Sequence, residues 1–317
     1  MPIRLGFIGC GHIATTHIRI LRSDPRCQIA GVHDLSPERA NATGVPVFES
    51  AGALIDAVDA VYVTSPNRLH LEHALAALEQ RKHVFCEKPM GVTLAEARSI
   101  AEGAAKAGTV FQVGHNRRFA PVYQALKAAI TSPALGADLK MNRGELENPP
   151  WTVDEKITGG FLFETPIHIF DMARFLMGEI VEVTARAESQ VYPTLDSFFA
   201  LFRFASGRTA TFRSCAYTGW SFPFERVEVY SKHSTFATEE MDRILLARGL
   251  NTPTEIADYR HLPWEQRWGY VEEDRLFLNA IEQGTPPPVN ALDGLRAVEI
   301  ACAIYESART GAPVSVE

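Results

Sequence analysis

A lysine and a histidine are the two side chains whose local pattern best suits acid–base chemistry. Lys88 lies in Glu87-Lys88-Pro89, directly after the apolar run 83–86. Because proline removes a backbone donor and holds the chain extended, we expect Lys88 at the end of a strand. A lysine held partly out of water beside a cationic ring has a lowered pKa and can transfer a proton. For the isolated motif, a solvated surface lysine is the alternative.

The histidine is His168, which follows Gly159-Gly160 and Glu164-Thr165-Pro166. Thr165 and Pro166 are typical of an N-cap and a first helical residue, which predicts His168 in the first turn of a helix and Glu164 just outside it. The positive end of a helix lowers the pKa of a first-turn histidine, and neutral imidazole can both donate to and accept from a substrate hydroxyl. The alternative is a core histidine that caps its own helix.

A glycine turn near the start of the chain is typical of dinucleotide binding. The spacing is G-x-G-x-x-A, formed by Gly9, Gly11 and Ala14, between an apolar run at 3–8 and a helical pattern that begins near His12. Gly9 permits a tight bend, Gly11 lets a diphosphate approach the backbone, and Ala14 lets helix and strand pack closely. The first residues of the helix, His12 and Ile13, would present backbone N–H groups to the diphosphate.

Asp34 indicates which dinucleotide is preferred. It follows a second apolar run at 27–33, where a carboxylate can accept both ribose hydroxyls of an adenosine. A 2′-phosphate about 4 Å away would meet repulsion of about 4 kcal/mol per charge pair at an effective dielectric near 20. Leu35 and Ser36 supply no arginine to offset it. The sequence therefore predicts NAD rather than NADP.

These residues fit one repeating framework over the first 120 residues. Apolar runs predict strands at 3–8, 27–33, 45–48, 60–63, 83–86 and 109–113. Helical patterns lie between them, notably after Ser36-Pro37 and over 69–78 and 94–107. Six β-α repeats predict a parallel sheet with helices on both faces, a Rossmann domain. The polar clusters at 9–11, 34, 65–67, 87–88 and 116–118 all follow strands, at the edge where such sheets bind ligands.

From Pro121 onward the β-α alternation is lost. A linking helix is expected to end over 125–130, and strands are expected at 139–146, 181–191, 198–204, 209–216 and 224–230, followed by helices through Leu276 and over 292–308. Successive strands without intervening helices predict a large, mostly antiparallel open sheet in an α+β domain. We expect Phe199 and Phe212 or their neighbours on its uncovered face, as a contact for a homodimer or homotetramer.

Length and composition agree with two domains, 1–120 and 121–317. The net charge of −7 argues against binding to nucleic acid or to an anionic membrane. The first strand starts at Ile3, so we expect no targeting segment and a cytoplasmic protein with five reduced cysteines. His70 and His73 share a helix face without a third ligand, so no metal site is expected.

In this order the motifs resemble those of the Gfo/Idh/MocA oxidoreductases. The resemblance is carried by the glycine turn, Ser65-Pro66-Asn67 with His70, Lys82-His83-Val84 before Glu87-Lys88-Pro89, and Asn116-Arg117-Arg118-Phe119. It implies that Lys88 is the catalytic lysine, often followed by a cis proline. It also implies that the cofactor is surrounded by Ser65, Pro66, Asn67, His70, Glu87 and Asn116.

The resemblance extends to the second half. The family pattern there is G-G, then aspartate, a small residue, histidine and a second aspartate. Gly159, Gly160, His168 and Asp171 match it, whereas Glu164 replaces the first aspartate and Pro166 replaces a glycine. The resemblance implies that His168 binds the reacting hydroxyl and shares its proton, and that Glu164 orients the lysine or the substrate.

Further substrate contacts are implied for Thr165, Asp171 and Arg117 or Arg118. For Asp171 the alternative is a structural role in anchoring its own helix.

The function expected from these features is hydride transfer between NAD and a secondary alcohol of a sugar, a sugar derivative or an inositol. Lys88 would transfer the hydroxyl proton, at a site between the two domains. Two alternatives share the fold. One is a non-catalytic, NAD-sensing regulatory protein, and the other is a glycosidase that uses tightly held NAD for transient oxidation.

Overall fold

The chain folds into two compact units, and neither is a continuous stretch of sequence. The computed structural model describes residues 1–316. Unit 1 comprises Met1–His115 and Tyr270–Val298, and unit 2 comprises Asn116–Gly269 and the segment from Glu299 to the C-terminal end. The expected division at residue 120 therefore differs from the observed one in two respects. The first unit ends five residues earlier, and it recovers a segment from the far end of the chain.

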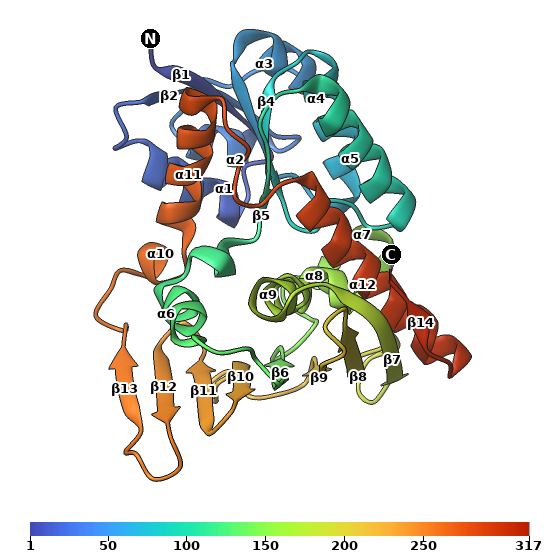
Figure 1. Cartoon of the computed structure of the whole chain (residues 1–317). Coiled ribbons are helices and arrows are strands. Elements are labelled where there is room, and N and C mark those ends of the chain that lie inside the picture. The colour runs from blue at the N-terminus through green and yellow to red at the C-terminus, as the bar shows by residue number, and fades with distance from the viewer. Residues whose placement is uncertain (317) are drawn as a thin grey trace. The chain divides into compact units, whose positions relative to one another are not determined.

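Unit 1 contains a five-stranded parallel sheet in the order β2-β1-β3-β4-β5 (Figure 1). Its strands are β1 (Ile3–Ile8), β2 (Cys27–His33), β3 (Ala60–Val63), β4 (His83–Glu87) and β5 (Phe111–Gly114). Every strand pair in this sheet is parallel. The predicted Rossmann-type sheet is confirmed, because short apolar runs followed by glycine or polar residues are a strong local signal for buried parallel strands.

The expectation of a strand at 45–48 is wrong. This segment makes only an isolated bridge between Val47 and Val32. The Val32 N–H donates to the Pro46 carbonyl oxygen, and the Phe48 N–H donates to the Val32 carbonyl oxygen. Pro46 itself has no N–H to donate. Two hydrogen bonds to one residue do not extend into a ladder.

The helices of unit 1 cover both faces of its sheet (Figure 1). They are α1 (His12–Leu21), α2 (Pro37–Ala42), α3 (Ala51–Ala57), α4 (His70–Glu79), α5 (Leu94–Ala107) and α11 (Tyr270–Gln283), with a 3₁₀ turn, η1 (Asn67–Leu69). Helix α11 contacts α1, and its Phe277 and Leu278 are fully buried with Leu5 and Phe7 of β1. Burial of this apolar helix face explains why a late segment returns to the first unit.

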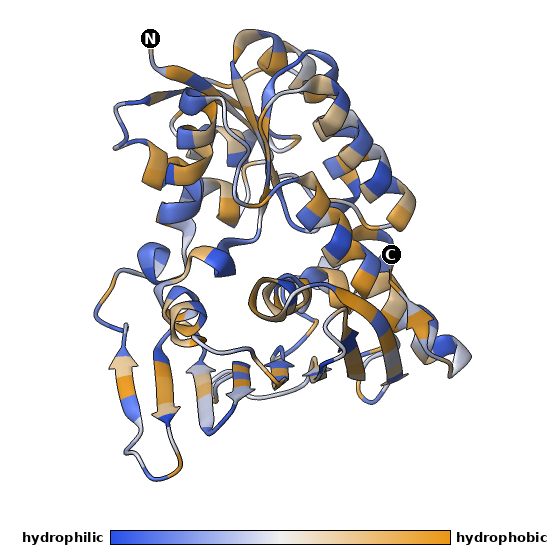
Figure 2. Cartoon of the chain, in the orientation of Figure 1, coloured by the Kyte–Doolittle hydropathy of each residue, from blue (hydrophilic) through white to orange (hydrophobic). Residues whose placement is uncertain are grey.

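Unit 2 contains a nine-stranded sheet in the order β13-β12-β11-β10-β6-β9-β8-β7-β14. Its strands are β6 (Gly136–Met141), β7 (Ile180–Glu188), β8 (Ser197–Phe204), β9 (Thr209–Cys215), β10 (Glu225–Ser231), β11 (Ser234–Glu239), β12 (Arg243–Arg248), β13 (Glu255–Asp258) and β14 (Val314–Ser315). Only β6 and β9 pair in parallel among its ladders within residues 1–316. Apolar and polar residues alternate along β10 (Figure 2). The expectation of a large, mostly antiparallel sheet is confirmed.

The remaining helices are α6 (Pro121–Ala129), α7 (Glu155–Thr158), α8 (Phe161–Glu164), α9 (Ile167–Met177), α10 (Trp264–Arg267) and α12 (Ala291–Thr310), with 3₁₀ turns η2 (Asn116–Phe119) and η3 (Pro150–Val153). Phe170 of α9 packs edge-on against Phe202 and Phe212. Phe212 is therefore buried, and its placement on the uncovered face was wrong. Phe199 and Leu201 are exposed instead, because Ala200 lies opposite Phe212 in the β8–β9 ladder and faces the core with it.

Within residues 1–316, no helix combines the length and the apolar character needed to cross a bilayer.

Candidate active site

The glycine turn after β1 is packed against the end of β3. Gly9 has a φ of +94°, and a Cβ built on it would lie 2.6 Å from the backbone of Ser65. A larger residue is excluded by both the conformation and the contact. The Thr64 hydroxyl donates to the Gly9 carbonyl oxygen at 2.8 Å. The turn is thus fixed to the next strand end of the sheet.

Gly11, at the N-terminus of α1, has no neighbouring atoms where a side chain would lie. Gly11 is the N-cap of this helix and offers no side-chain cap, and a Cβ built on Gly11 would meet no atom within 4 Å. The first-turn N–H groups of an α-helix have no acceptor within the helix, and together with the helix dipole they favour an anion. This end of the helix fits a diphosphate, as the glycine spacing predicts.

Asp34 lies at the end of β2 with its carboxylate anchored by backbone donors. Oδ2 accepts from the Cys10 N–H and Oδ1 from the Ser36 N–H, each at 2.7 Å. A carboxylate has about four acceptor positions, so two remain for ribose hydroxyls. The structure adds Arg39, whose Nε is 3.4 Å from Asp34 Oδ1. Leu35 and Ser36 supply no arginine, as expected, but the first turn of α2 brings Arg39 back toward Asp34.

The end of β3 carries the Ser65-Pro66-Asn67 motif and is tied to the end of β4 by His70. The His70 ring lies between two backbone carbonyl oxygens, with Nε2 2.8 Å from Ser65 O and Nδ1 2.7 Å from Pro89 O. Burial lowers the pKa of His70, although both carbonyl groups act to raise it. This contact places residues 65 and 89, and hence the two strand ends, side by side.

Around that contact, Ser65 Oγ is 2.9 Å from His73 Nδ1. Asn67 is buried and begins η1, with Pro66 as its N-cap. His70 therefore braces the segment that follows Lys88, because each of its ring nitrogens lies within hydrogen-bond distance of a backbone carbonyl oxygen.

Lys88 follows the last residue of β4, as its motif predicts. The peptide bond between Lys88 and Pro89 is cis. The Lys88 backbone N–H donates to Glu87 Oε2 at 3.1 Å. Glu87 is 6% exposed, whereas Lys88 is partly exposed. The lysine is thus held at the strand end by the side chain of its own predecessor.

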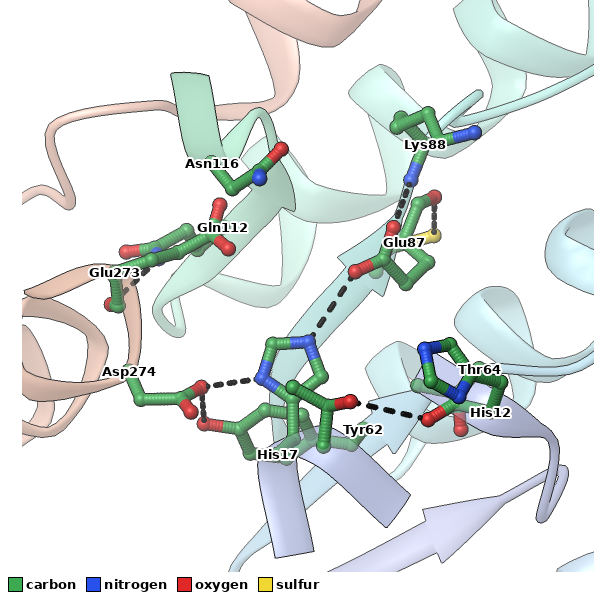
Figure 3. A network of polar contacts seen from close by, with 12 residues as sticks. His12, His17, Tyr62, Thr64, Glu87, Lys88, Gln112, Asn116, Glu273 and Asp274 are labelled. Atoms are coloured by element: carbon green, nitrogen blue, oxygen red, sulfur yellow. Dashed lines mark hydrogen bonds and ion pairs between the residues drawn. The ribbon is translucent and has the colours of Figure 1, made fainter. Parts of the chain in front are cut away.

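Glu87 belongs to a buried polar network shown in Figure 3. Its Oε1 is 3.2 Å from Nε2 of His17, and Nδ1 of the same ring is 2.8 Å from Asp274 Oδ1. The Tyr62 hydroxyl donates to that same Asp274 oxygen at 3.0 Å. Burial acts to lower the pKa of His17, but the charges and hydrogen bonds of Asp274 and Glu87 raise it to about 10.

Sequence reasoning assigned no role to His17 or to Asp274. His17 sits at apolar helical spacing, and its partner lies 257 positions later. No local signal connects the two residues.

In unit 2, His168 is the second residue of α9, in its first turn as expected. It is buried, with 6% of its surface exposed. The expectation that Thr165 caps this helix was wrong. Residues 161–164 form the short helix α8 and Thr165 is its C-cap, so Pro166 takes the N-cap position of α9 without a side-chain hydrogen bond.

Glu164 and Thr165 share a partner that sequence reasoning missed. Arg143, which follows β6, has one guanidinium nitrogen 3.8 Å from Glu164 Oε1 and 3.4 Å from Thr165 Oγ1. The same guanidinium donates to the carbonyl oxygens of Glu145 and Asn148. Arg143 therefore couples Glu164 and Thr165 to the 145–148 loop. No motif marks this arginine in the sequence.

Arg118 and Asp171 form a two-pronged ion pair. Arg118 Nε donates to Asp171 Oδ2 at 2.8 Å and a terminal nitrogen donates to Oδ1 at 2.6 Å. Arg174, one turn along α9, lies 3.9 Å from Oδ1. Asp171 is fully buried, so its carboxylate joins the segment after β5 to α9. This arrangement supports the anchoring role weighed for Asp171.

Arg117 points into a second buried ion pair. Two of its nitrogens lie 3.3 Å from Glu225 Oε2, and its guanidinium carbon is 4.6 Å from the ring centre of Trp268. Asn116 accepts from Arg117 and donates to the Trp268 carbonyl oxygen. The structure thus joins Asn116 and Arg117 to the interior of unit 2.

No cluster of three or more His, Cys, Asp or Glu side chains suited to a metal ion occurs among residues 1–316.

Comparison with known proteins identifies the family. The family model for the Gfo/Idh/MocA group described as "Oxidoreductase family, NAD-binding Rossmann fold" matches residues 3–115. The companion model described as "Oxidoreductase family, C-terminal alpha/beta domain" matches residues 136–316.

Individual proteins match over nearly the whole chain. A Bacillus subtilis protein named "Uncharacterized oxidoreductase YrbE" is 29% identical over 329 residues, covering 98% of this chain and 96% of that protein. An inositol 2-dehydrogenase of Rubrobacter xylanophilus is 30% identical over 337 residues, covering 99% of this chain and 93% of the enzyme. The solved structure of a levoglucosan dehydrogenase with NADH covers 100% of both chains with a TM-score of 0.91 and 20% identity, and so shares the fold. The chain is therefore an NAD-binding oxidoreductase of the Gfo/Idh/MocA family.

Proposed function

We propose that this oxidoreductase transfers hydride between NAD and a secondary alcohol of a sugar, a sugar derivative or an inositol, with Lys88 as the proton-transfer group. The observation that carries the proposal is the placement of Lys88. It follows β4 in the unit that also contains the glycine turn and Asp34. The substrate class is supported by the inositol 2-dehydrogenase relative.

The residues that would hold NAD come mainly from the ends of β1, β2 and β3 in unit 1. Gly9 and Gly11, with the backbone of His12 and Ile13, would bind the diphosphate, and Asp34 would bind the adenosine ribose. The end of β3 contributes Ser65, Pro66 and Asn67, and His70 braces it. NAD supplies the hydride acceptor at the nicotinamide when it is bound. We expect Asn116, Arg117 and Arg118 to help seat cofactor and substrate through the segment that they anchor.

The proton leaves the substrate hydroxyl for Lys88 Nζ in the oxidative direction, and the same group returns it in the reductive direction. His168 would hold the reacting hydroxyl with its imidazole. Glu164 and Thr165, positioned by Arg143, would orient the substrate. Glu164 keeps the charge of the family's aspartate and adds one methylene to the side chain.

Replacement of the lysine tests the proposal. Lys88→Met should lower kcat by about 100- to 10,000-fold, because a positioned acid or base contributes a factor of that size. The Kd for NAD, measured by fluorescence titration, should remain near that of the wild type. Lys82→Met is the matched control, because Lys82 precedes the other end of β4 and its ammonium binds the Val58 carbonyl oxygen. Unchanged turnover in Lys88→Met would remove Lys88 from the mechanism.

A substrate screen separates this proposal from its alternatives. Free polyols, aldoses and glycosides are incubated with NAD while absorbance of NADH and release of free sugar are followed. Net NADH formation from a free alcohol supports the dehydrogenase. Sugar release without net NADH supports a glycosidase, and binding of NAD without either product supports a regulatory protein.

We also propose a homodimer or homotetramer formed through the outer face of the unit 2 sheet. Phe199 is 48% exposed and Leu201 is 43% exposed, side by side on β8. Exposed apolar area of this kind favours a subunit contact. Light scattering at micromolar concentration should give a multiple of the 35.0 kDa chain mass, and a monomer would contradict the proposal.

A cytoplasmic location is part of the same proposal. All five cysteines are free thiols, as is usual in a reducing compartment. Cell fractionation with an antibody to the chain provides the test.

A further inference from the structure

A histidine is buried between two carboxyl groups, one of which belongs to the residue just before the proposed catalytic lysine. His17 is fully buried on α1, with Glu87 of β4 on one side of its ring and Asp274 of α11 on the other (Figure 3). The two distances are 3.2 Å and 2.8 Å. Neither His17 nor Asp274 has a role in the proposed proton transfer.

The geometry requires the ring to be doubly protonated when both carboxyl groups are ionised. An ionised carboxylate only accepts hydrogen bonds, and neutral imidazole has a single N–H. Both ring nitrogens of His17 face carboxyl oxygens, so both must donate. In that state the ring is a buried imidazolium that joins two acidic groups by charge-assisted hydrogen bonds. Burial raises the pKa of Asp274, whereas His17 and the Tyr62 hydroxyl act to lower it.

The surroundings of the ring agree with this charge. Tyr62 of β3 and Tyr270 of α11 lie against the ring, at centroid distances of 5.4 Å and 5.7 Å, and Phe85 of β4 lies at 5.0 Å. Lys88, which follows Glu87 in the chain, also acts to lower the pKa of the Glu87 carboxyl. Glu273, next to Asp274, adds a further buried acidic group. Acidic side chains therefore face the ring from β4 and α11, with neutral aromatic rings between them.

Glu87 transmits the position of the ring to Lys88. One of its carboxylate oxygens faces His17 and the other accepts from the Lys88 backbone N–H. The carboxylate also packs on Gly114, where an added Cβ would lie 2.9 Å from it. Little room is left for Glu87 to turn.

We propose that His17, as a charged link between α11 and β4, is a positioning residue that holds Glu87 ionised and in one orientation and thereby fixes the backbone that presents Lys88. This inference rests on the proposed function of Lys88. It adds a role for the returning segment 270–298, which supplies the second carboxyl group to the unit that binds NAD.

The protonation state is tested first in the unaltered protein. In protein labelled with ¹⁵N in histidine, the His17 ring should show two protonated nitrogens at about pH 8, well above the ordinary histidine pKa of about 6.5. The signal is assigned by its loss in His17→Gln, or by through-bond correlation if that variant does not fold. A neutral His17 ring at this pH would overturn the proposal.

Activity of His17→Gln tests the positioning role. Glutamine can donate to only one of the two carboxyl groups, so Glu87 loses its charged partner and burial then raises its pKa. We expect kcat per NAD-binding site to fall by up to about 100-fold, the scale of a small misplacement, with little change in the Kd for NAD. The activity profile should move to higher pH, because Glu87 must be ionised to hold the Lys88 backbone.

His83→Gln is the matched control. His83 begins the same strand, at the end away from Glu87, and its Nδ1 accepts from the Val110 N–H. It should lose some stability while its kcat and pH profile stay unchanged. If His17→Gln likewise loses stability while its kcat and pH profile stay unchanged, His17 has only a structural role and the proposal fails.

Asp274→Asn should add a step to the dependence of kcat on pH that a purely structural role of His17 would not produce. The asparagine keeps an oxygen for Tyr62 and His17 but removes the charge that raises the pKa of His17. Its kcat should therefore fall as pH rises through the neutral range, where the imidazolium is lost, and this step should be absent from the double variant with His17→Gln. An Asp274→Asn profile like that of the wild type would contradict the proposal.

Failure of the underlying function gives a different pattern. If Lys88→Met keeps full turnover, the function of Lys88 is wrong whatever His17 does. If Lys88→Met is inactive while His17→Gln has normal kcat and pH dependence, only the positioning role is wrong.

Discussion

Each unit of the molecule contains a buried cluster of a cation, a carboxylate and a tyrosine, and the two clusters differ in the cation. In unit 1 the cation is the imidazolium of His17, with Asp274 and Tyr62. In unit 2 it is the guanidinium of Arg117, which pairs with Glu225 while the Tyr123 hydroxyl donates to the other Glu225 oxygen at 2.5 Å.

This difference decides how each cluster responds to pH. A guanidinium stays charged throughout the range in which proteins fold, so the unit 2 cluster is held permanently. The charge on His17 exists only because of its neighbours, since burial alone would lower its pKa. Burial raises the pKa of Tyr62 and Tyr123, so both tyrosines remain donors. The arginine cluster therefore provides fixed architecture, whereas the histidine cluster behind Lys88 depends on pH.

The largest effect is expected when the carboxylate of Glu225 in unit 2 is removed. Glu225→Leu leaves Arg117 charged, buried and without its carboxylate, which should lower the free energy of unfolding by about 3–5 kcal/mol. Urea unfolding, followed by the fluorescence of the tryptophans in unit 2, measures the loss. The double variant Arg117→Met/Glu225→Leu should recover most of it, because no uncompensated charge remains. Equal losses in both variants would show that packing rather than charge dominates.

The next prediction concerns stability against pH. The folded-state pKa of His17 is raised, so its stabilisation is fully present below its ordinary value of 6.5 and is lost as pH rises to about 10. The difference in unfolding free energy between wild type and His17→Gln should therefore shrink steadily over this window. The corresponding difference for Glu225→Leu should stay flat. If the difference in unfolding free energy is independent of pH for both variants, the proposed contrast between the two clusters is wrong.

The smallest effect is expected for the two tyrosines. Tyr62→Phe and Tyr123→Phe each remove a buried hydroxyl that donates to a carboxylate, which should cost about 1.5–3 kcal/mol. The stability losses should be similar, but only Tyr62→Phe should change the ¹⁵N spectrum of the His17 ring, because Tyr62 and His17 share Asp274 Oδ1. A change in that spectrum in Tyr123→Phe would mean that the clusters do not act separately.

Local sequence patterns predicted unit 1 well. Strands β1, β2 and β3 and helix α5 have the predicted bounds, because each has an apolar run or a capped helical pattern with clear end signals. Helix α3 was missed, since its seven residues are too short to show helical periodicity.

The far part of the unit 2 sheet was not predicted. Strand β12 has four apolar residues in a row between two arginines, whereas β11 and β13 are short and mix polar with apolar residues, and β13 is largely exposed at the sheet edge. None of the three strands shows a clear period-two pattern. They form because β10 offers an open edge for pairing, a condition that no local window contains.

The sequence by itself determined the chemistry available at the strand ends, because a glycine turn, a terminal carboxylate and a lysine before proline each act through their immediate neighbours in the chain. Only the tertiary structure decided which charges meet. His17 and Asp274 are 257 positions apart and Arg117 and Glu225 are 108 apart, and nothing in either local context specifies the partner. Pairing of buried charges follows from the packing of whole elements, since an ionised group is accommodated in the interior only where folding brings an opposite charge or donor to it.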